Sequence, residues 1–240
     1  YLGKTHAAIA SNKAGVMKAG VPLIYATDRE DVAEVFEKRG QELVCPSYRL
    51  GRDFGYQDRG VYFDFFYQDK CIKGIRLEMP GQHQKANASL ALMTMQSLET
   101  QYPALSKEII LSALSRSCWL GRTEFIRPNL MIDGAHNNES VQVLVDLLRT
   151  DYADKDVHIL FAAIEGKPVT TMLDMLNQFA SLTVTSFDFP KALQLEAYPN
   201  PYAKVSSWQD WLEMVSLDEQ KLYLVPGSLY FISEIRQSLV

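Results

Sequence analysis

Residues 129–148, NLMIDGAHNNESVQVLVDLL, decide the fold that the sequence predicts. They combine a short buried strand, a polar turn that begins at Asp133, and an amphipathic helix from about Glu139. In open α/β sheets, ligands collect where the carboxyl end of a strand meets the amino terminus of a helix. We expect Asp133, His136 and Asn137 at such an edge. A plain connector needs few polar groups, so we interpret this turn as a binding site.

Length and composition predict a folded α/β protein with a substantial core. The chain has 240 residues, enough for one large domain or two modest ones. Hydrophobic residues make up 47% of the sequence, so general disorder is not expected. The formal net charge is -5, with acidic and basic residues interspersed. A broad nucleic-acid footprint needs a concentrated basic face, so we expect no nucleic-acid partner.

Cysteines and apolar runs indicate the compartment. Cys45, Cys71 and Cys118 lie far apart and form no CxxC pair, so a reducing cytoplasm fits better than a zinc ribbon or disulfide framework. No apolar run reaches the roughly 18 residues of a membrane span, and no signal-peptide pattern opens the chain. The chain starts at Tyr1, with a helix and no preceding strand, so we expect a fragment of a longer protein.

The first half of the chain mixes a strand–helix–strand rhythm with a hairpin. The predicted elements are a helix over 5–18, a strand over 21–26, a helix from Asp28 to Gly40, a strand over 42–45, hairpin strands over 61–67 and 71–78, and helices over 82–102 and 106–117. The strand–helix–strand part is typical of a parallel sheet. The aromatic runs joined by a three-residue turn indicate an antiparallel hairpin.

The second half returns to alternating strands and helices. The predicted strands are 123–127, 129–133, 157–163, 181–186 and 221–225, and the predicted helices are 138–150, 168–179, 208–216 and 228–238. The first two strands are too close for a parallel crossover, so we predict an antiparallel pair. We place the boundary between two domains near residues 118–123.

Lys13 and residues 81–87 are candidate functional groups in the first half. Lys13 is followed by Ala14 and Gly15, which permit close backbone approach, although most helical lysines are simply solvated. Residues 81–87 open the long helix, where unpaired N–H groups and the helix dipole favour an anion. Turn and capping residues are the plain alternative. The amide of Asn87 suits a base edge or a ribose.

The second half contributes four more candidates. Arg122 follows Gly121 at the proposed boundary, where an arginine suits either a phosphate or an ordinary interdomain salt bridge. An ionised Asp133 is a good acceptor for ribose hydroxyls, whereas its plain alternative is a helix N-cap. His136 is otherwise a satisfied turn histidine. Ser228 opens a second strand–turn–helix and is either an N-cap or a ligand donor.

No GxxxxGK[ST] phosphate loop, GxGxxG or GxSxG motif occurs in the sequence. The usual cradle for a triphosphate is therefore absent from these 240 residues. Trp208 and Trp211, three residues apart on a predicted helix, are expected in the core.

Taken in order, the motifs resemble the folylpolyglutamate synthase/dihydrofolate synthase family of the Mur ligase superfamily. They are LGKTHAAIASNKAGVMKAGVP (2–22), PGQHQKANASLAL (80–92), LGRTEFI (120–126), LMIDGAHNNES (130–140), SFDFPKA (186–192) and PGSLYFISEIR (226–236). The resemblance implies an α/β fold: residues 1–120 would be the tail of a P-loop-type ATPase domain, and 121–240 a Rossmann-like Mur ligase C-terminal domain.

The resemblance also implies roles for individual residues. Lys13 matches the lysine that becomes carbamylated and helps to hold Mg²⁺, because a carbamate supplies carboxylate-like oxygen ligands. Asn87, Arg122 and Asp133 match positions that bind ATP, with Arg122 at the phosphates and Asp133 at the ribose. His136 belongs to the same motif and would line the nucleotide as part of the catalytic set. Ser228 is a weaker candidate for binding the incoming glutamate.

The sequence departs from the family pattern at several positions. Asn12 replaces the acidic residue usual before the lysine, Leu120 replaces a proline, and residues 166–168 only partly match an acidic-Lys segment. The P-loop, the metal-binding Ser and Glu, and a further His are expected upstream of Tyr1. His6 lies after the position of that further His in the motif, so we do not assign the role of the missing ligand to His6.

The activity implied by the resemblance is ATP-dependent amide-bond formation. The γ-phosphate would pass to a carboxylate of dihydropteroate or a folate, and the amino group of L-glutamate would displace phosphate from the acyl phosphate. The chain alone is expected to be inactive without the missing N-terminal part of the same protein. Two alternatives stay open: a Mur-type ligase acting on a cell-wall precursor, and a non-catalytic nucleotide-binding module.

Overall fold

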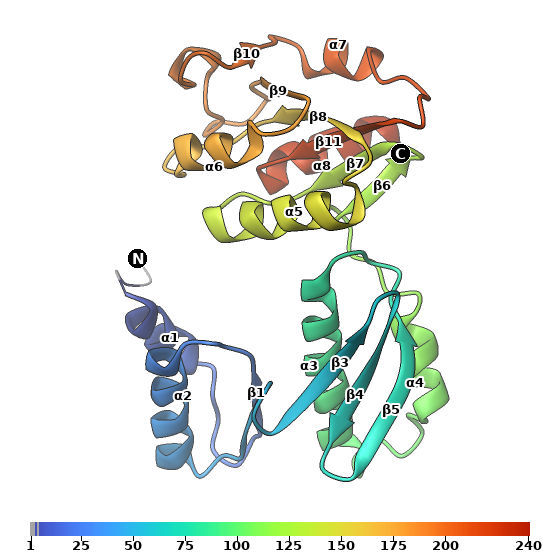
Figure 1. Cartoon of the computed structure of the whole chain (residues 1–240). Helices are drawn as coiled ribbons and strands as arrows, with labels where there is room; N and C mark the ends of the chain where they lie inside the picture. The colour runs from blue at the N-terminus through green and yellow to red at the C-terminus, as the bar shows by residue number, and fades with distance from the viewer. Residues whose placement is uncertain (1–2, 4) are drawn as a thin grey trace. The chain divides into compact units, whose positions relative to one another are not determined.

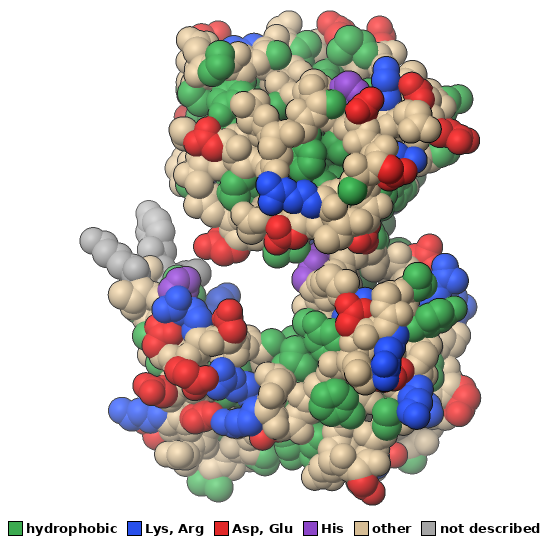
Figure 2. Space-filling model, in the orientation of Figure 1, with side chains coloured by type: hydrophobic (Ala, Val, Ile, Leu, Met, Phe, Trp, Pro, Cys, Tyr) green, Lys and Arg blue, Asp and Glu red, His purple; other side chains and the backbone are tan. Residues whose placement is uncertain are grey.

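The computed structural model describes residue 3 and residues 5–240, which form two compact units (Figure 1). The first unit contains the described residues up to Glu78 together with Gln82–Ser117, and the second contains Met79–Gly81 and Cys118–Val240. No helix within the described part of the chain is long and apolar enough to cross a membrane. Acidic and basic side chains are interspersed over the visible faces, so no field of a single sign dominates there (Figure 2).

The first unit combines helices with two small sheets. Its elements are α1 (His6–Ala14), β1 (Leu23–Tyr25), α2 (Glu30–Leu43), β2 (Ser47–Arg49), β3 (Phe54–Arg59), β4 (Tyr62–Tyr67), β5 (Lys70–Arg76), α3 (Gln82–Leu98) and α4 (Lys107–Leu114). β1 and β2 pair in parallel, and β3–β4–β5 form an antiparallel sheet. The predicted hairpin is confirmed as β4–β5. Helix α1 ends at Ala14, whereas the sequence predicts a helix over 5–18.

The predicted strand over 42–45 is wrong. Helix α2 continues to Leu43, and Val44 ends it in the left-handed conformation with φ of 51°. Gly40 looked like a stop signal, but it lies buried within the helix, where a Cβ would come within 2.9 Å of Ser47 Oγ. Glycine is needed there for close packing against the next strand, which begins at Ser47.

Strand β3 was not predicted, because its sequence FGYQDR contains glycine and polar residues that disfavour strands. Its six residues all pair with β4, so tertiary pairing overrides local preference. Gly55 lies opposite Phe66, and a Cβ at Gly55 would come within 2.5 Å of the Phe66 ring. The ring therefore covers the space that a side chain would fill.

Helix α3 packs on the β3–β4–β5 sheet over an aromatic core. The buried members of this core are Phe54, Phe63, Phe65, Ile75, Ala88, Leu92 and Met93. Near the start of α3, the Lys85 ammonium pairs with Asp58 and donates to the Gly60 carbonyl oxygen at 2.7 Å. These contacts tie the β3–β4 turn to the helix that carries Asn87.

The second unit is built on a six-stranded sheet with the order β10–β9–β8–β11–β7–β6. Its elements are β6 (Glu124–Arg127), β7 (Leu130–Asp133), α5 (Asn138–Asp151), β8 (Asp156–Phe161), α6 (Val169–Leu176), β9 (Ser181–Val184), the 3₁₀ turn η1 (Leu195–Ala197), β10 (Ala203–Lys204), α7 (Trp208–Glu213), β11 (Lys221–Pro226) and α8 (Leu229–Leu239). β6 and β7 are antiparallel, as predicted, and the other neighbours are parallel.

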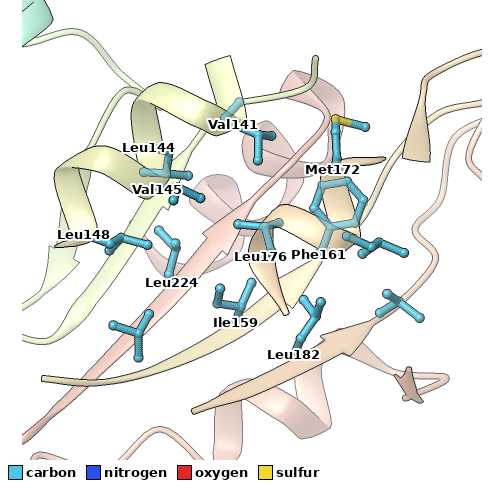
Figure 3. Close-up of a cluster of buried hydrophobic side chains, with 14 of the residues drawn as sticks. Val141, Leu144, Val145, Leu148, Ile159, Phe161, Met172, Leu176, Leu182 and Leu224 are labelled. Carbon is cyan, nitrogen blue, oxygen red and sulfur yellow. The ribbon is translucent and has the colours of Figure 1, made fainter. Parts of the chain in front are cut away.

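Helices cover both faces of this sheet. One core lies between the sheet and helices α5 and α6, and its labelled members are Val141, Leu144, Val145, Leu148, Ile159, Phe161, Met172, Leu176, Leu182 and Leu224 (Figure 3). The other core contains α7 and α8, with Trp208, Trp211, Phe231, Ile232 and Ile235 among its buried residues. Successive residues of the central strands alternate between the two cores, which gives the doubly wound α/β arrangement. Both tryptophans are in the core, as predicted.

Candidate functional site

The carboxyl ends of β7, β11 and β8 meet at one edge of the sheet, with β11 between the other two. The chain leaves β7 and β8 toward α5 and α6 on one face, and it leaves β11 toward α8 on the other face. Neighbouring strands whose connections diverge in this way open a crevice, the usual ligand site of an open α/β sheet. The predicted residues of the second unit all lie at this edge.

The turn that carries Arg122 is held by several backbone contacts. The N–H of Gly134 donates to the Gly121 carbonyl oxygen at 2.8 Å, and the N–H of Thr123 donates to Asp133 Oδ2 at 2.7 Å. Gly121 and Thr123 both have positive φ, 72° and 42°. A β-branched residue rarely adopts this conformation, so the turn around Arg122 is strained and held by its partners.

Asp133 is the last residue of β7 and is only 7% exposed. It is not the N-cap of α5. Asn137 has that role, through a reciprocal pair of hydrogen bonds with Ser140. Burial raises the pKa of the Asp133 carboxyl above its ordinary 3.8, against the Thr123 N–H and the Arg122 charge, which lower it. A buried carboxylate beside an arginine is typical of a functional position.

The Gly134 carbonyl oxygen is a point of convergence. Arg122 Nη1 lies 3.4 Å from it, and His136 Nδ1 lies 2.7 Å from it. A carbonyl oxygen only accepts hydrogen bonds, so the His136 Nδ1 carries the hydrogen and Nε2 of the neutral ring keeps its lone pair. The structure thus brings Arg122, Asp133 and His136 together at the end of β7.

Ser228 follows β11 and is 3% exposed. Of the two alternatives for Ser228, the helix cap is observed: Ser228 Oγ accepts from the Tyr230 N–H at 3.3 Å, and the Ser228 N–H donates to the Ala162 carbonyl oxygen at 2.9 Å. A small cavity of about 110 Å³ lies beside it. The cavity is lined by His136, Phe161, Ala163, Ile164, Lys167, Ser228, Leu229 and Tyr230.

Two lining residues were not predicted from the sequence, Lys167 and Tyr230. Lys167 follows Gly166 in the β8–α6 loop and is half-buried, with no ion pair among the described residues. The partial match of residues 166–168 to an acidic-Lys segment was the available signal. The Tyr230 ring stacks on Phe189 of the SFDFPKA motif, with ring centroids 4.0 Å apart, so this motif supports a residue that lines the cavity.

Lys13 and Asn87 belong to the first unit. Lys13 is exposed in the last turn of α1. The Asn87 amide on α3 donates to Gln84 Oε1 at 3.1 Å. Among residues 3 and 5–240, no group of three or more His, Cys, Asp or Glu side chains lies close enough to hold a metal ion. The described residues therefore do not by themselves form a magnesium site.

Comparison with known proteins gives extensive matches. A dihydrofolate synthase/folylpolyglutamate synthase from Bacillus subtilis is 32% identical over 254 residues, which cover 99% of this chain and 59% of that protein. A solved FPGS–AMPPCP complex has a TM-score of 0.79 and 26% identity, and the match covers 99% of this chain and 58% of that one. A Mycobacterium tuberculosis folylpolyglutamate synthase complexed with ADP has a TM-score of 0.87 and 21% identity, over 100% and 60%. No protein-family model matches the chain.

The chain therefore has a mixed α/β fold of the Mur ligase type, and the predicted fold class is confirmed. Over nearly its whole length, the chain is homologous to the dihydrofolate synthase/folylpolyglutamate synthase and the folylpolyglutamate synthase that it matches in sequence. The chain spans about three fifths of the length of these relatives: 59% of the Bacillus subtilis protein and 59% of a folylpolyglutamate synthase from Lacticaseibacillus casei.

Proposed function

We propose that the protein carrying this chain is an ATP-dependent ligase that joins L-glutamate to dihydropteroate or a reduced folate. The observation that carries the proposal is the meeting of Arg122, Asp133, His136 and Ser228 at one sheet edge, in a chain homologous to folylpolyglutamate synthases. The two units would correspond to the end of the ATPase domain and to the Mur ligase C-terminal domain.

The nucleotide would bind at the β7 end of this edge. Arg122 supplies a planar cation suited to phosphate oxygens, and Asp133 supplies an acceptor for ribose hydroxyls. For Asn87, which belongs to the first unit, a role in nucleotide binding rests on the family resemblance alone. The FPGS–AMPPCP complex, whose protein is 26% identical, supports nucleotide binding. Carbamylated Lys13 would contribute one oxygen ligand to Mg²⁺, and the described residues contain no group of three or more His, Cys, Asp or Glu that could complete the site.

The incoming glutamate would bind in the cavity beside Ser228. The cavity lining combines a hydroxyl, an imidazole and the Lys167 ammonium. An ammonium without an ion-pair partner suits a carboxylate, and the serine hydroxyl provides a neutral donor. We propose that Lys167 binds a carboxylate of the amino acid and Ser228 contributes a hydrogen bond.

The reaction would proceed in two steps, phosphorylation of the folate carboxylate and then formation of the amide bond. A folate carboxylate oxygen attacks the γ-phosphorus of ATP, and ADP leaves, which gives an acyl phosphate. The glutamate nitrogen then attacks the carbonyl carbon, inorganic phosphate leaves, and the nitrogen loses a proton. His136 lines the cavity with Nε2 unprotonated in its neutral form, so it can accept that proton. Arg122 would stabilise charge that develops on the phosphates.

A turnover assay tests the proposal. The full-length protein is expected to incorporate radiolabelled glutamate into dihydropteroate or tetrahydrofolate only when ATP is present. The 240-residue chain by itself is expected to be inactive, because its sequence contains no GxxxxGK[ST] loop to bind the β- and γ-phosphates. Ligation of a cell-wall precursor instead of a folate would indicate a Mur-type ligase. Nucleotide binding without any ligation would indicate a non-catalytic module.

Lys167→Met is expected to raise the KM for glutamate at least about tenfold, because a charge-assisted hydrogen bond contributes about 1.5–3 kcal/mol. The KM for ATP and kcat should change less than about twofold, because the lost contact is made equally before and during the reaction. Lys167→Arg should recover most of the affinity. Lys191→Met, at an exposed lysine outside the cavity, is the matched control. An unchanged KM for glutamate in Lys167→Met would remove Lys167 from the proposed site.

A further inference from the structure

Helix α8 contacts the Arg122 turn through an ion pair that joins distant parts of the chain. Arg236 Nε on α8 lies 2.9 Å from Glu124 Oε1 at the start of β6, 112 residues away in sequence. The two side chains are 30% and 20% exposed, so solvent screens the pair less than it would a surface pair. A pair this far apart in sequence fixes the helix against the strand.

The other oxygen of the same carboxylate reaches the turn itself. Glu124 Oε2 accepts from the Gly121 N–H at 2.6 Å. Gly121 lies against α8, where a Cβ would come within 3.0 Å of Ile232 Cγ2. Arg122 therefore sits in a turn that is held on one side by Asp133, through the Thr123 N–H, and on the other side by Glu124.

We propose that Glu124 and Arg236 are positioning residues for Arg122, and that helix α8 links the nucleotide arginine to the amino-acid cavity. Arg236 orients the Glu124 carboxylate, and the carboxylate holds the Gly121 N–H, which sets the direction in which Arg122 leaves the turn. The same helix begins at its N-cap Ser228, which lines the cavity. This proposal rests on the proposed function, because it takes Arg122 as a nucleotide ligand.

The Glu124–Arg236 ion pair could instead stabilise the fold without positioning Arg122. The experiment therefore separates the ion pair from the hydrogen bond between Glu124 and the Gly121 N–H. The double variant Glu124→Arg with Arg236→Glu retains an ion pair between the two positions. An arginine at position 124 has no acceptor, however, so the Gly121 N–H loses its partner. Glu234→Met is the matched control: Glu234 also lies on α8 and accepts from Trp208 Nε1 at 2.9 Å, without contacting the turn.

Two readouts are measured on the full-length protein: hydrogen exchange of the Gly121 amide, and ADP affinity by NMR titration, which detects millimolar dissociation constants. Arg236→Met should raise the Kd for ADP about tenfold and speed Gly121 exchange about tenfold, the scale of a lost charge-assisted hydrogen bond. The swapped pair should recover thermal stability but not ADP affinity. Glu234→Met should lower Tm and leave the Kd within about twofold.

If the swapped pair recovered both the thermal stability and the ADP affinity of the unmodified protein, the ion pair would act only on stability, and the proposal would be overturned. Unchanged Gly121 exchange in Arg236→Met would overturn the link through Glu124, whatever the nucleotide does. Absence of ADP binding by the unmodified protein would instead contradict the proposed function, and the exchange measurement would still decide whether Arg236 holds the turn.

Discussion

Gly227→Ala is expected to cost more than about 3 kcal/mol of folding free energy, because the new methyl group overlaps backbone that cannot move away. A Cβ at Gly227 would lie 2.0 Å from the Ala162 carbonyl oxygen, and φ at this position is 140°. The same carbonyl oxygen accepts the Ser228 N–H, so any shift that relieves the overlap also breaks this bond. Urea denaturation followed by circular dichroism measures the loss.

Gly166→Ala is the matched control for this variant. Gly166 also has positive φ, 76°, but a Cβ there would meet nothing within 4 Å. Its expected cost is about 1 kcal/mol, the price of the backbone conformation alone. Similar losses for the two variants would show that the close approach of Gly227 to Ala162 adds nothing to the cost of the substitution. Because Gly227 precedes Ser228, the fold and the proposed amino-acid cavity depend on the same close contact.

Asp133→Asn is expected to weaken ADP binding about tenfold or more while it stabilises the fold at neutral pH. The loss of affinity follows from replacing a charged acceptor by a neutral one. The gain in stability follows from removing a buried charge, since burial raises the pKa of the Asp133 carboxyl. Calorimetric titration with ADP and urea denaturation measure the two effects, and we expect the free energy of unfolding of Asp133→Asn to exceed that of the unmodified protein at pH 7.

The stabilisation of the fold by Asp133→Asn should depend on pH, and the raised pKa of Asp133 sets the direction of this dependence. With a raised pKa in the folded state, the native protein binds more protons than the unfolded chain between the two pKa values. Stability from this group is therefore complete below the ordinary value of 3.8 and is lost as pH rises through the folded pKa. The advantage of Asp133→Asn should thus shrink as pH falls toward 4. Exposed Asp188→Asn is the control, and lower stability of Asp133→Asn at pH 7 would contradict the argument.

Much of the second unit could be predicted because its central strands are buried on both faces. Such strands read as continuous apolar runs, and β7, β8 and β11 were located in this way. The two-residue strand β10 was not predicted, because Ala203–Lys204 has no apolar pattern. Similarly, β3 forms through its pairing with β4, a long-range effect that local sequence does not encode.

In the candidate site, too, local sequence predicts some residues, whereas others come together only through the fold. A polar turn after a buried strand is visible in sequence, and this pattern predicts Asp133 and His136 at the sheet edge. Their roles stay proposals. The Glu124–Arg236 pair could not be predicted, since 112 residues separate its members and only the fold brings them together. Lys167 comes from a loop with a weak motif, and its place in the cavity depends on the packing of β8 beside β11.

The central position of β11 has a consequence for how the protein is made. β7 and β8 follow one another in sequence, yet they do not pair, because residues 221–226 lie between them and bond to both. On a ribosome, the first strands of this unit emerge many residues before their shared partner. The edges of β7 and β8 that bond to β11 stay unpaired until residues 221–226 have been synthesised, so the sheet cannot close strand by strand in sequence order.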